Sequence, residues 1–362
     1  MVRKIALTML AAMAVLVPAP LLAQGDLLVI AHRGASGERP EHTLAAYERA
    51  IEAGADYIEP DLVVTKDLEL VARHENELSD TTDVASREEF EDRRRDKMID
   101  GQRVAGWFAE DFTLAELRTL RAKERVPAIR PANARYDGLY QVPTLAEIVQ
   151  LVRIKEAETG QRVGIYPELK HPTFLLEDSG IDMVDLLLRE LRDLDVKATD
   201  PVFIQSFEVG VLQRLNQRSD FKLVQLVKPE DGPADEPDMR YADMVSPTGL
   251  AEIATYADAI GAAIPMILGA DGTTTSLVAD AKAAGLPVHA WTVREENGFL
   301  PQTLRSGGGD SVRGCPDILQ RMLATAGVDG IFADDPRNAI DRRDNGTAYC
   351  ARAVGPVRPL QK

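Results

Sequence analysis

Cysteine and long apolar runs are scarce in this sequence, and basic residues are fewer than acidic ones. Its 362 residues include only two cysteines, and 58 acidic residues outnumber 42 basic ones to give a formal net charge of −16. A surface this acidic argues against nucleic acid and anionic membranes as partners. The hydrophobic fraction of 45% is enough for one large core or two modest ones, and we find no internal repeat.

The most extended apolar stretch lies at the N-terminus. Arg3 and Lys4 precede an apolar run over residues 5–17, and small residues follow as far as Ala23. This layout predicts a secretory signal peptide over residues 1–23, with residues 24–362 as the mature protein. The run is too short for a comfortable membrane span. We therefore expect a periplasmic or secreted protein with no stable membrane insertion after signal cleavage, and an uncleaved anchor is the alternative.

The two cysteines, Cys315 and Cys350, lie near the C-terminus. Export to an oxidising compartment favours a disulfide between them, and two free thiols are the alternative. Because no cysteine lies near the predicted cleavage site, a lipid-modified N-terminus is not expected. The residues carry no signal for a particular oligomeric state.

Short apolar runs alternate with amphipathic ones about eight times along the mature chain. Predicted strands include LLVIAH, DYIEPDLVV, LELVARHE, GIYPELK and PVHAWTV, and EHTLAAYERAIEAG is typical of the predicted helices. This alternation predicts an α/β fold with a parallel sheet, of which a barrel is the closed version. Residues 76–140 are charged and poor in strand signal, as expected of an insertion after an early strand.

Two pairs of charged residues lie two positions apart inside apolar runs, so each pair shares one face of a strand. The pairs are Glu59 with Asp61, and Glu168 with Lys170. Two carboxylates on one face repel each other and need a cation between them unless they are solvated. A hard divalent ion with oxygen ligands meets that need, with Glu168 as a candidate third ligand. Taken alone, each pair is equally well explained as surface charge or an exposed ion pair.

Other polar and aromatic residues fall near strand ends. His32 and Arg33 end the first predicted strand, His74 ends another, and Trp291 lies late in a third. The C-terminal ends of the strands form the reactive face of a parallel α/β barrel, so one rim would gather these groups. A lone histidine is more often structural than catalytic, but agreement among several strands favours a site. Three histidines give weaker signals: His42 lines the pocket or packs, His171 resembles a loop residue, and His289 shares a face with Trp291.

A divalent cation beside Arg33, Lys170, His32 and His74 would form a site for an anionic, oxygen-rich group such as phosphate. A phosphodiester resists hydrolysis because its charge repels nucleophiles and its alkoxide is a poor leaving group. Cations offset the first obstacle and a protonated imidazole the second. A second imidazole can accept the proton of the attacking hydroxyl.

Six motifs occur in order over residues 28–340: HRGASGERPEHT, EPDLVVTKD, ARHE, YPELKHP, HAWTVR and GVDGIFADDP. In this order they resemble the glycerophosphodiester phosphodiesterase family, and the long segment after His74 resembles its periplasmic bacterial branch. The resemblance implies a TIM barrel with a small inserted domain after an early strand. It implies hydrolysis of glycerophosphodiesters, such as glycerophosphocholine and glycerophosphoethanolamine, to sn-glycerol 3-phosphate and an alcohol. It also implies one divalent cation, with calcium favoured over magnesium.

The resemblance further implies a role for each matching residue. His32 and His74 match the two acid/base histidines, and Glu59, Asp61 and Glu168 match the metal ligands. Arg33 matches the phosphate-binding arginine, Lys170 matches the lysine beside the third ligand, and Phe207 and Trp291 resemble the aromatics that line the substrate. The chain departs from the family pattern at Glu75, where aspartate is commoner, and in the late run Ala333-Asp334-Asp335-Pro336.

Several alternatives stay open at this point. A lysophospholipase D-type phosphodiesterase would keep the site but need an apolar groove, which the charged segment 76–140 does not suggest. A non-catalytic periplasmic binding protein for phosphorylated solutes would have no need of two histidines, and a metal-dependent lyase would not require them at these positions. In a diesterase, either the 2-hydroxyl of the glycerol moiety attacks first to give a cyclic phosphate, or water attacks directly.

Overall fold

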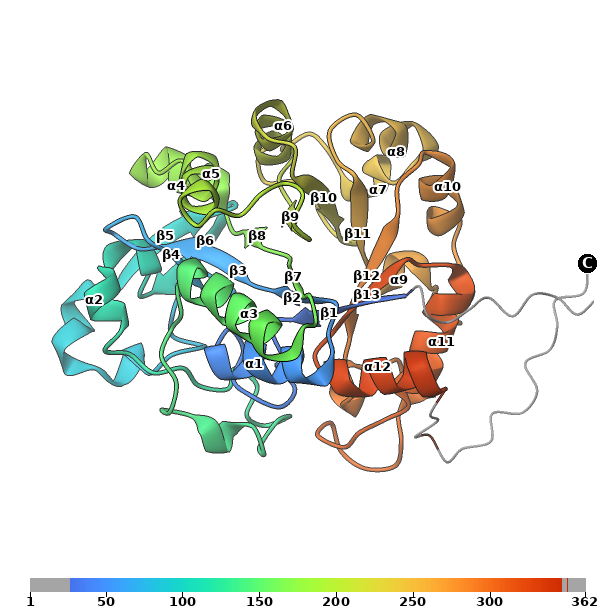
Figure 1. The fold of residues 1–362 in the computed structure, drawn as a ribbon, viewed down its shortest axis with the longest axis horizontal. Coiled ribbons are helices and arrows are strands. Elements are labelled where there is room, and N and C mark those ends of the chain that lie inside the picture. The colour runs from blue at the N-terminus through green and yellow to red at the C-terminus, as the bar shows by residue number, and fades with distance from the viewer. Residues whose placement is uncertain (1–26, 347–349, 351–362) are drawn as a thin grey trace, which may run out of the picture.

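A ring of parallel strands forms the centre of the structure, a computed structural model that describes residues 27–346 and residue 350 (Figure 1). The strands of the ring are β1 (Leu28–His32), β2 (Tyr57–Glu59), β3 (Asp61–Val64), β7 (Gly164–Ile165), β8 (Glu168–Leu169), β9 (Phe203–Ser206), β10 (Lys222–Val227), β11 (Ala259–Ala263), β12 (Val288–Val293) and β13 (Gly330–Ala333). β2 and β3 are one strand interrupted at Pro60, which has no amide hydrogen for the ladder. β7 and β8 are interrupted in the same way at Pro167.

The pairing of these strands returns to its starting point. β1 pairs with β13 on one side and β2 on the other, and β3 continues through β8 to β9. If each interrupted strand is taken as one, eight parallel positions close the ring. The TIM barrel implied by the sequence is therefore confirmed.

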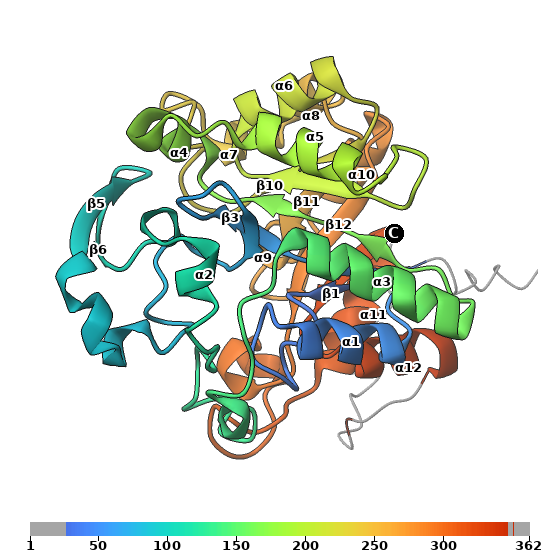
Figure 2. The same cartoon turned by 60° about the vertical axis from the view of Figure 1, so that its left-hand side comes forward.

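Helices cover the outside of the barrel (Figures 1 and 2). They are α1 (Leu44–Ala53), α3 (Leu145–Thr159), α4 (Pro172–Ser179), α5 (Met183–Asp193), α6 (Val209–Arg218), α7 (Tyr241–Met244), α8 (Pro247–Ile253), α9 (Ile264–Ile267), α10 (Leu277–Ala283), α11 (Pro316–Ala326) and α12 (Pro336–Asn345). Local signals fix their ends. The side chain of Thr43 caps α1 by accepting a hydrogen bond from the Ala46 amide, and Gly54 ends the helix at a φ of 93°.

A small cluster of large side chains lies beneath the C-terminal rim of the barrel. Ile30, Tyr166, Val224 and Phe332 form a separate core group that is fully or almost fully buried. They alternate along the strands with residues of the main core, which face the helices. His289 joins this cluster because its Nδ1 lies 2.8 Å from the Tyr166 hydroxyl.

The strand β4 (Leu70–Ala72) differs from the expectation that it belongs to the parallel alternation. It pairs antiparallel with β3 at the edge of the sheet, outside the ring. Only residues 65–69 separate the two strands, and a parallel crossover needs a dozen residues or more. His74 therefore follows a hairpin strand rather than a barrel strand.

The segment between β4 and α3 projects from one side of the barrel (Figure 2). It contains α2 (Leu114–Leu117) and an antiparallel hairpin of β5 (Arg95–Ile99) and β6 (Gln102–Gly106). Its own apolar cluster includes Leu78, Trp107 and Phe112. Across residues 27–346, every helix is too short or too polar to cross a membrane.

The predicted disulfide between Cys315 and Cys350 is present, with 5.3 Å between the two Cα atoms. Cys315 precedes α11, directly after the glycine-rich loop that follows β12. The predicted signal peptide, residues 1–23, lies outside the described residues.

Candidate active site

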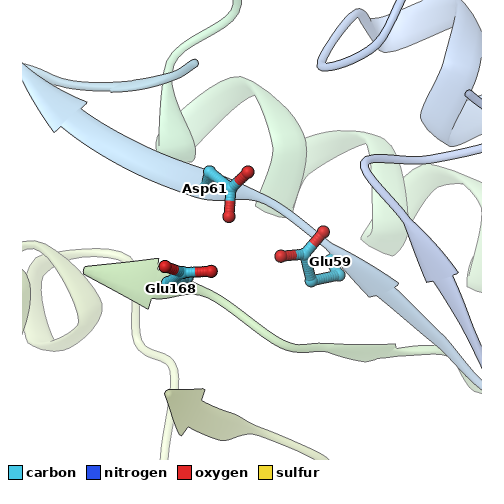
Figure 3. A group of neighbouring side chains, drawn as sticks. All are labelled: Glu59, Asp61 and Glu168. Carbon is cyan, nitrogen blue, oxygen red and sulfur yellow. The ribbon is translucent and has the colours of Figure 1, made fainter. Parts of the chain in front are cut away.

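Three carboxylates converge at the rim of the barrel, as their spacing predicts. Glu59 ends β2, Asp61 begins β3, and Glu168 begins β8 opposite Asp61 in the strand register. One oxygen from each lies within 4.8 Å of the others, and all three side chains are buried. Figure 3 shows the three groups facing one another from neighbouring strands.

Burial and mutual repulsion disfavour the ionised forms of Glu59 and Glu168 in this cluster. Burial and the charge of Asp61 raise the pKa of Glu59 well above its usual value, and burial raises the pKa of Glu168 to about 8 although Lys170 opposes it. Burial acts in the same direction on Asp61, but His42 and Lys170 hold its pKa well below the usual range. A divalent cation would offset the excess negative charge.

The donor set fits a hard cation with oxygen ligands. Besides the three carboxylates, Gln205 donates a hydrogen bond from Nε2 to Glu59 Oε1 at 3.0 Å. The Oε1 of Gln205 is buried and has no hydrogen-bond partner among the described residues. A neutral oxygen therefore lies beside the three carboxylates. Glu59, Asp61 and Glu168 are the residues that would hold the ion.

Arg33, Lys170 and His42 contact the three carboxylates. The Arg33 amide donates to Glu59 at 2.8 Å, and its Nε lies 3.4 Å from Asp61. Lys170 Nζ donates to Glu168 at 3.0 Å. His42, for which the sequence left pocket lining and packing open, is fully buried, and its Nε2 lies 2.9 Å from Asp61.

His32 is held by a carboxylate from the last barrel strand. Its Nδ1 lies 2.6 Å from Oδ1 of Asp334, which follows β13. Burial and Arg33 lower the pKa of His32 to about 3, so the ring is neutral near pH 7 in the free enzyme. With Nδ1 turned to Asp334, the other ring nitrogen is left for the pocket.

His74 has a similar partner in Glu75, whose Oε1 lies 2.8 Å from His74 Nδ1. The other oxygen of Glu75 lies 2.8 Å from His171 Nε2, and His171 Nδ1 lies 2.7 Å from Asp100 at the tip of the β5–β6 hairpin. Burial and Arg33 lower the pKa of His74 to about 4. The departure at Glu75 thus preserves a carboxylate beside the histidine.

A pocket of about 1150 Å³ opens at this rim. Eight of the nine predicted site residues line it: His32, Arg33, Glu59, His74, Glu168, Lys170, Phe207 and Trp291. Asp61, the ninth, lies directly behind them in the acidic cluster. The structure therefore brings all nine together, whereas His289 lies below them in the barrel interior.

Residues 32–338 match the model of the glycerophosphoryl diester phosphodiesterase family. The chain belongs to this family. A glycerophosphodiester phosphodiesterase of Arabidopsis thaliana is 34% identical over 84% of this chain and 82% of its own. One of Haemophilus influenzae is 29% identical over 88% of this chain and 90% of its own. The structure of an Oleispira antarctica phosphodiesterase in complex with the product sn-glycerol-3-phosphate has a TM-score of 0.57 and 21% identity, covering 87% of this chain and 96% of that chain. The chain is therefore an enzyme, and it shares its fold with the Oleispira antarctica structure.

Sequence reasoning missed several residues of the site in this phosphodiesterase. Asp334 was noticed only as part of the late ADDP run, and Arg130, which donates to Asp334, gave no signal in its irregular segment. Gln205 ends an apolar run and could have been found by the same rule that found Glu59. Glu41 receives two hydrogen bonds from Arg33, at 3.1 and 3.2 Å, within the first motif.

Proposed function

We propose that this phosphodiesterase hydrolyses glycerophosphodiesters, such as glycerophosphocholine and glycerophosphoethanolamine, to sn-glycerol 3-phosphate and an alcohol. The observation that carries the proposal is the meeting of three acids, two buried cations and two histidines around one pocket. The names of the relatives and the sn-glycerol-3-phosphate in the Oleispira antarctica structure support it.

The charged residues bind and orient the phosphodiester. Arg33 and Lys170 are buried and line the pocket, so their charges are weakly screened and attract the phosphoryl oxygens. Glu59, Asp61 and Glu168 would hold a divalent cation, which would help neutralise the negative charge of the phosphodiester. We favour calcium over magnesium because the motifs resemble the periplasmic branch of the family.

The two imidazoles move the protons. Each has Nδ1 turned to a carboxylate, so its other nitrogen is available to the substrate. One ring accepts the proton of the attacking hydroxyl while the other gives a proton to the leaving alkoxide as its P–O bond breaks. Both rings are neutral in the free enzyme, and the negative charge of the bound diester favours protonation of one of them.

The nucleophile is either the 2-hydroxyl of the glycerol moiety or water. Attack by the hydroxyl forms a cyclic phosphate that water then opens to sn-glycerol 3-phosphate. A 2-deoxy analogue of the substrate distinguishes the two routes. Normal turnover of that analogue would reject attack by the hydroxyl.

Export to the periplasm or the exterior is part of the proposal. The signal peptide predicted over residues 1–23 supports it, and so does the disulfide, because such bonds persist in oxidising compartments. The N-terminal sequence of the protein recovered after expression in a bacterial host tests cleavage near Ala23. A protein that is recovered from the cytoplasm and still begins at residue 1 would contradict the proposed export.

A coupled assay for sn-glycerol 3-phosphate with glycerophosphocholine tests the activity. We expect product to appear, EDTA to stop it, and added calcium to restore it better than magnesium. His32→Ala and His74→Ala should each abolish turnover with the fold intact, whereas a binding protein would release no product from the start. Preferential release of choline from lysophosphatidylcholine would favour the lysophospholipase D-type alternative instead.

A further inference from the structure

The pocket extends past the phosphate-binding end along a wall of three aromatic side chains. The ring of Phe207 meets that of Trp291 edge-to-face at 5.7 Å between centroids, and that of Tyr241 at 6.1 Å. Trp291 Nε1 donates to the Gly261 carbonyl at 3.0 Å, which fixes its ring. All three line the pocket. Aromatic faces attract cations through the ring quadrupole.

A carboxylate with unused hydrogen-bonding capacity adjoins this wall. Glu208 follows Phe207, lines the pocket and is 3% exposed. Its Oε2 accepts hydrogen bonds from the amide and hydroxyl of Thr173, but its Oε1 has no partner in the part of the chain that the structure describes. The N-terminal amides of α6 bond to Asp235 instead, so the helix makes no use of Glu208.

Burial makes the charge of this carboxylate costly in the free enzyme. It raises the pKa of Glu208 to about 7, against the hydrogen bond from Thr173. An unpaired buried carboxylate is stabilised by a cation that enters beside it. A neutral ligand at the same place leaves the cost unrelieved.

Acidic side chains predominate among the exposed charges of the pocket lining. Arg33 and Lys170 are buried beside the acidic cluster. Four acidic residues of the lining are exposed: Asp80, Asp100, Glu177 and Asp231. They outnumber two half-buried cations of the lining, Arg125 and Lys228, and Lys228 lies 3.4 Å from Asp231. A ligand with an anionic phosphodiester at one end and a cation at the other matches this arrangement.

We propose that Glu208, with Phe207, Tyr241 and Trp291, forms a subsite for a cationic group on the leaving alcohol. The inference rests on the proposed function and narrows it: diesters of amino alcohols, such as choline and ethanolamine, are preferred over diesters of neutral polyols.

The first experiment compares two substrates of the wild-type enzyme with calcium present. Release of sn-glycerol 3-phosphate gives kcat/KM for glycerophosphocholine and for the neutral-headed glycerophosphoglycerol. We expect the choline diester to be favoured by at least about tenfold. Equal values for the two diesters would overturn the inference and leave the proposed function standing. If neither diester is turned over, the proposed function and this inference are both rejected.

The second experiment removes the charge of Glu208. Glu208→Gln keeps the size of the side chain and its acceptor for Thr173. We expect the preference for the choline diester to fall by about tenfold, chiefly through KM. Glu190→Gln is the matched control, because burial also raises the pKa of Glu190 to about 7 but Glu190 lies on α5, outside the pocket lining. An unchanged preference in Glu208→Gln, or an equal fall in Glu190→Gln, would overturn the subsite.

Inhibition of the wild-type enzyme tests the subsite without any variant. Choline should compete with glycerophosphocholine, and its neutral carbon isostere should inhibit at least about tenfold more weakly. Equal inhibition by the two alcohols, or none by choline, would overturn the assignment.

Discussion

Arg130 Nη2 donates a hydrogen bond to Oδ2 of Asp334 at 2.5 Å, and through Asp334 the segment between β4 and α3 reaches His32. Arg294 Nε lies 3.1 Å from the same oxygen. Burial opposes ionisation of Asp334, but the two arginines and His32 hold its pKa well below the usual range. Asp334 therefore stays charged and orients the imidazole, which makes it a positioning residue.

We predict that Asp334→Asn lowers kcat for glycerophosphocholine by about 10- to 100-fold, with little change in KM. The amide is similar in size but cannot hold the Nδ1 proton as a charged acceptor, so the ring loses its fixed tautomer. Steady-state kinetics give the split between kcat and KM. Asp329→Asn is the control, because Asp329 precedes β13 and bonds to the Val288 amide at the opposite end of the barrel. A normal kcat in Asp334→Asn, or an equal loss in Asp329→Asn, would contradict the role.

The two acids at the centre of the cluster, Glu59 and Asp61, could be predicted because their relation is local. Residues two apart on a strand share a face whatever the tertiary structure, and this rule places Glu59 with Asp61 even across the interruption at Pro60. Glu168 joins them because β8 pairs with β3 in register. Strand periodicity was thus enough to pair Glu59 with Asp61, whereas Glu168 was a candidate third ligand that the family resemblance singled out.

The residues that hold the histidines in place could not be predicted, because their contacts join segments that are far apart in the sequence. Arg130 and Asp334 are 204 positions apart, and Arg130 lies in an irregular segment without hydrophobic periodicity. His171 resembled a loop residue, yet tertiary packing places it between Glu75 and Asp100. No period in the sequence encodes such contacts.

We predict a pH-dependent stabilisation by His171. Burial opposes its protonation, but hydrogen bonds to Asp100 and Glu75 raise its pKa from 6.5 to about 9. The folded state binds this proton more tightly than the unfolded state, so the stabilisation is fully present below pH 6.5 and is lost as the pH rises through about 9.

Urea unfolding of His171→Gln measures this contribution. Below pH 6.5 the variant should be less stable than wild type by about 1–2 kcal/mol, a value reduced because both carboxylates are partly exposed. Above pH 9 the two proteins should be nearly equal in stability. His289→Gln should show the opposite trend, because burial lowers the pKa of His289 to about 4. A constant deficit for His171→Gln at all pH values would contradict the charge pairing.

We predict that Gln205→Leu weakens binding of the divalent cation by about 10- to 100-fold. The substitution removes the hydrogen bond to Glu59 and the adjoining neutral oxygen, but leaves all three carboxylates in place. Titration calorimetry with calcium measures the affinity without any substrate. Gln225→Leu is the control, since Gln225 is an equally buried amide on the neighbouring strand β10 that bonds to Tyr256 rather than to an acid of the cluster. Equal affinities in wild type and Gln205→Leu would contradict the role of the amide.

We predict that loss of the disulfide destabilises the protein without slowing catalysis. Cys315 and Cys350 are 35 positions apart, and a loop of that length corresponds to about 2–4 kcal/mol of unfolding free energy. Cys350→Ser should lose this amount in urea unfolding, and a reducing agent should lower wild type to the same level while leaving the variant unchanged. kcat should be preserved because Cys315 lies outside the pocket lining. A variant that responds to the reducing agent as wild type does would show that the stabilisation has another source.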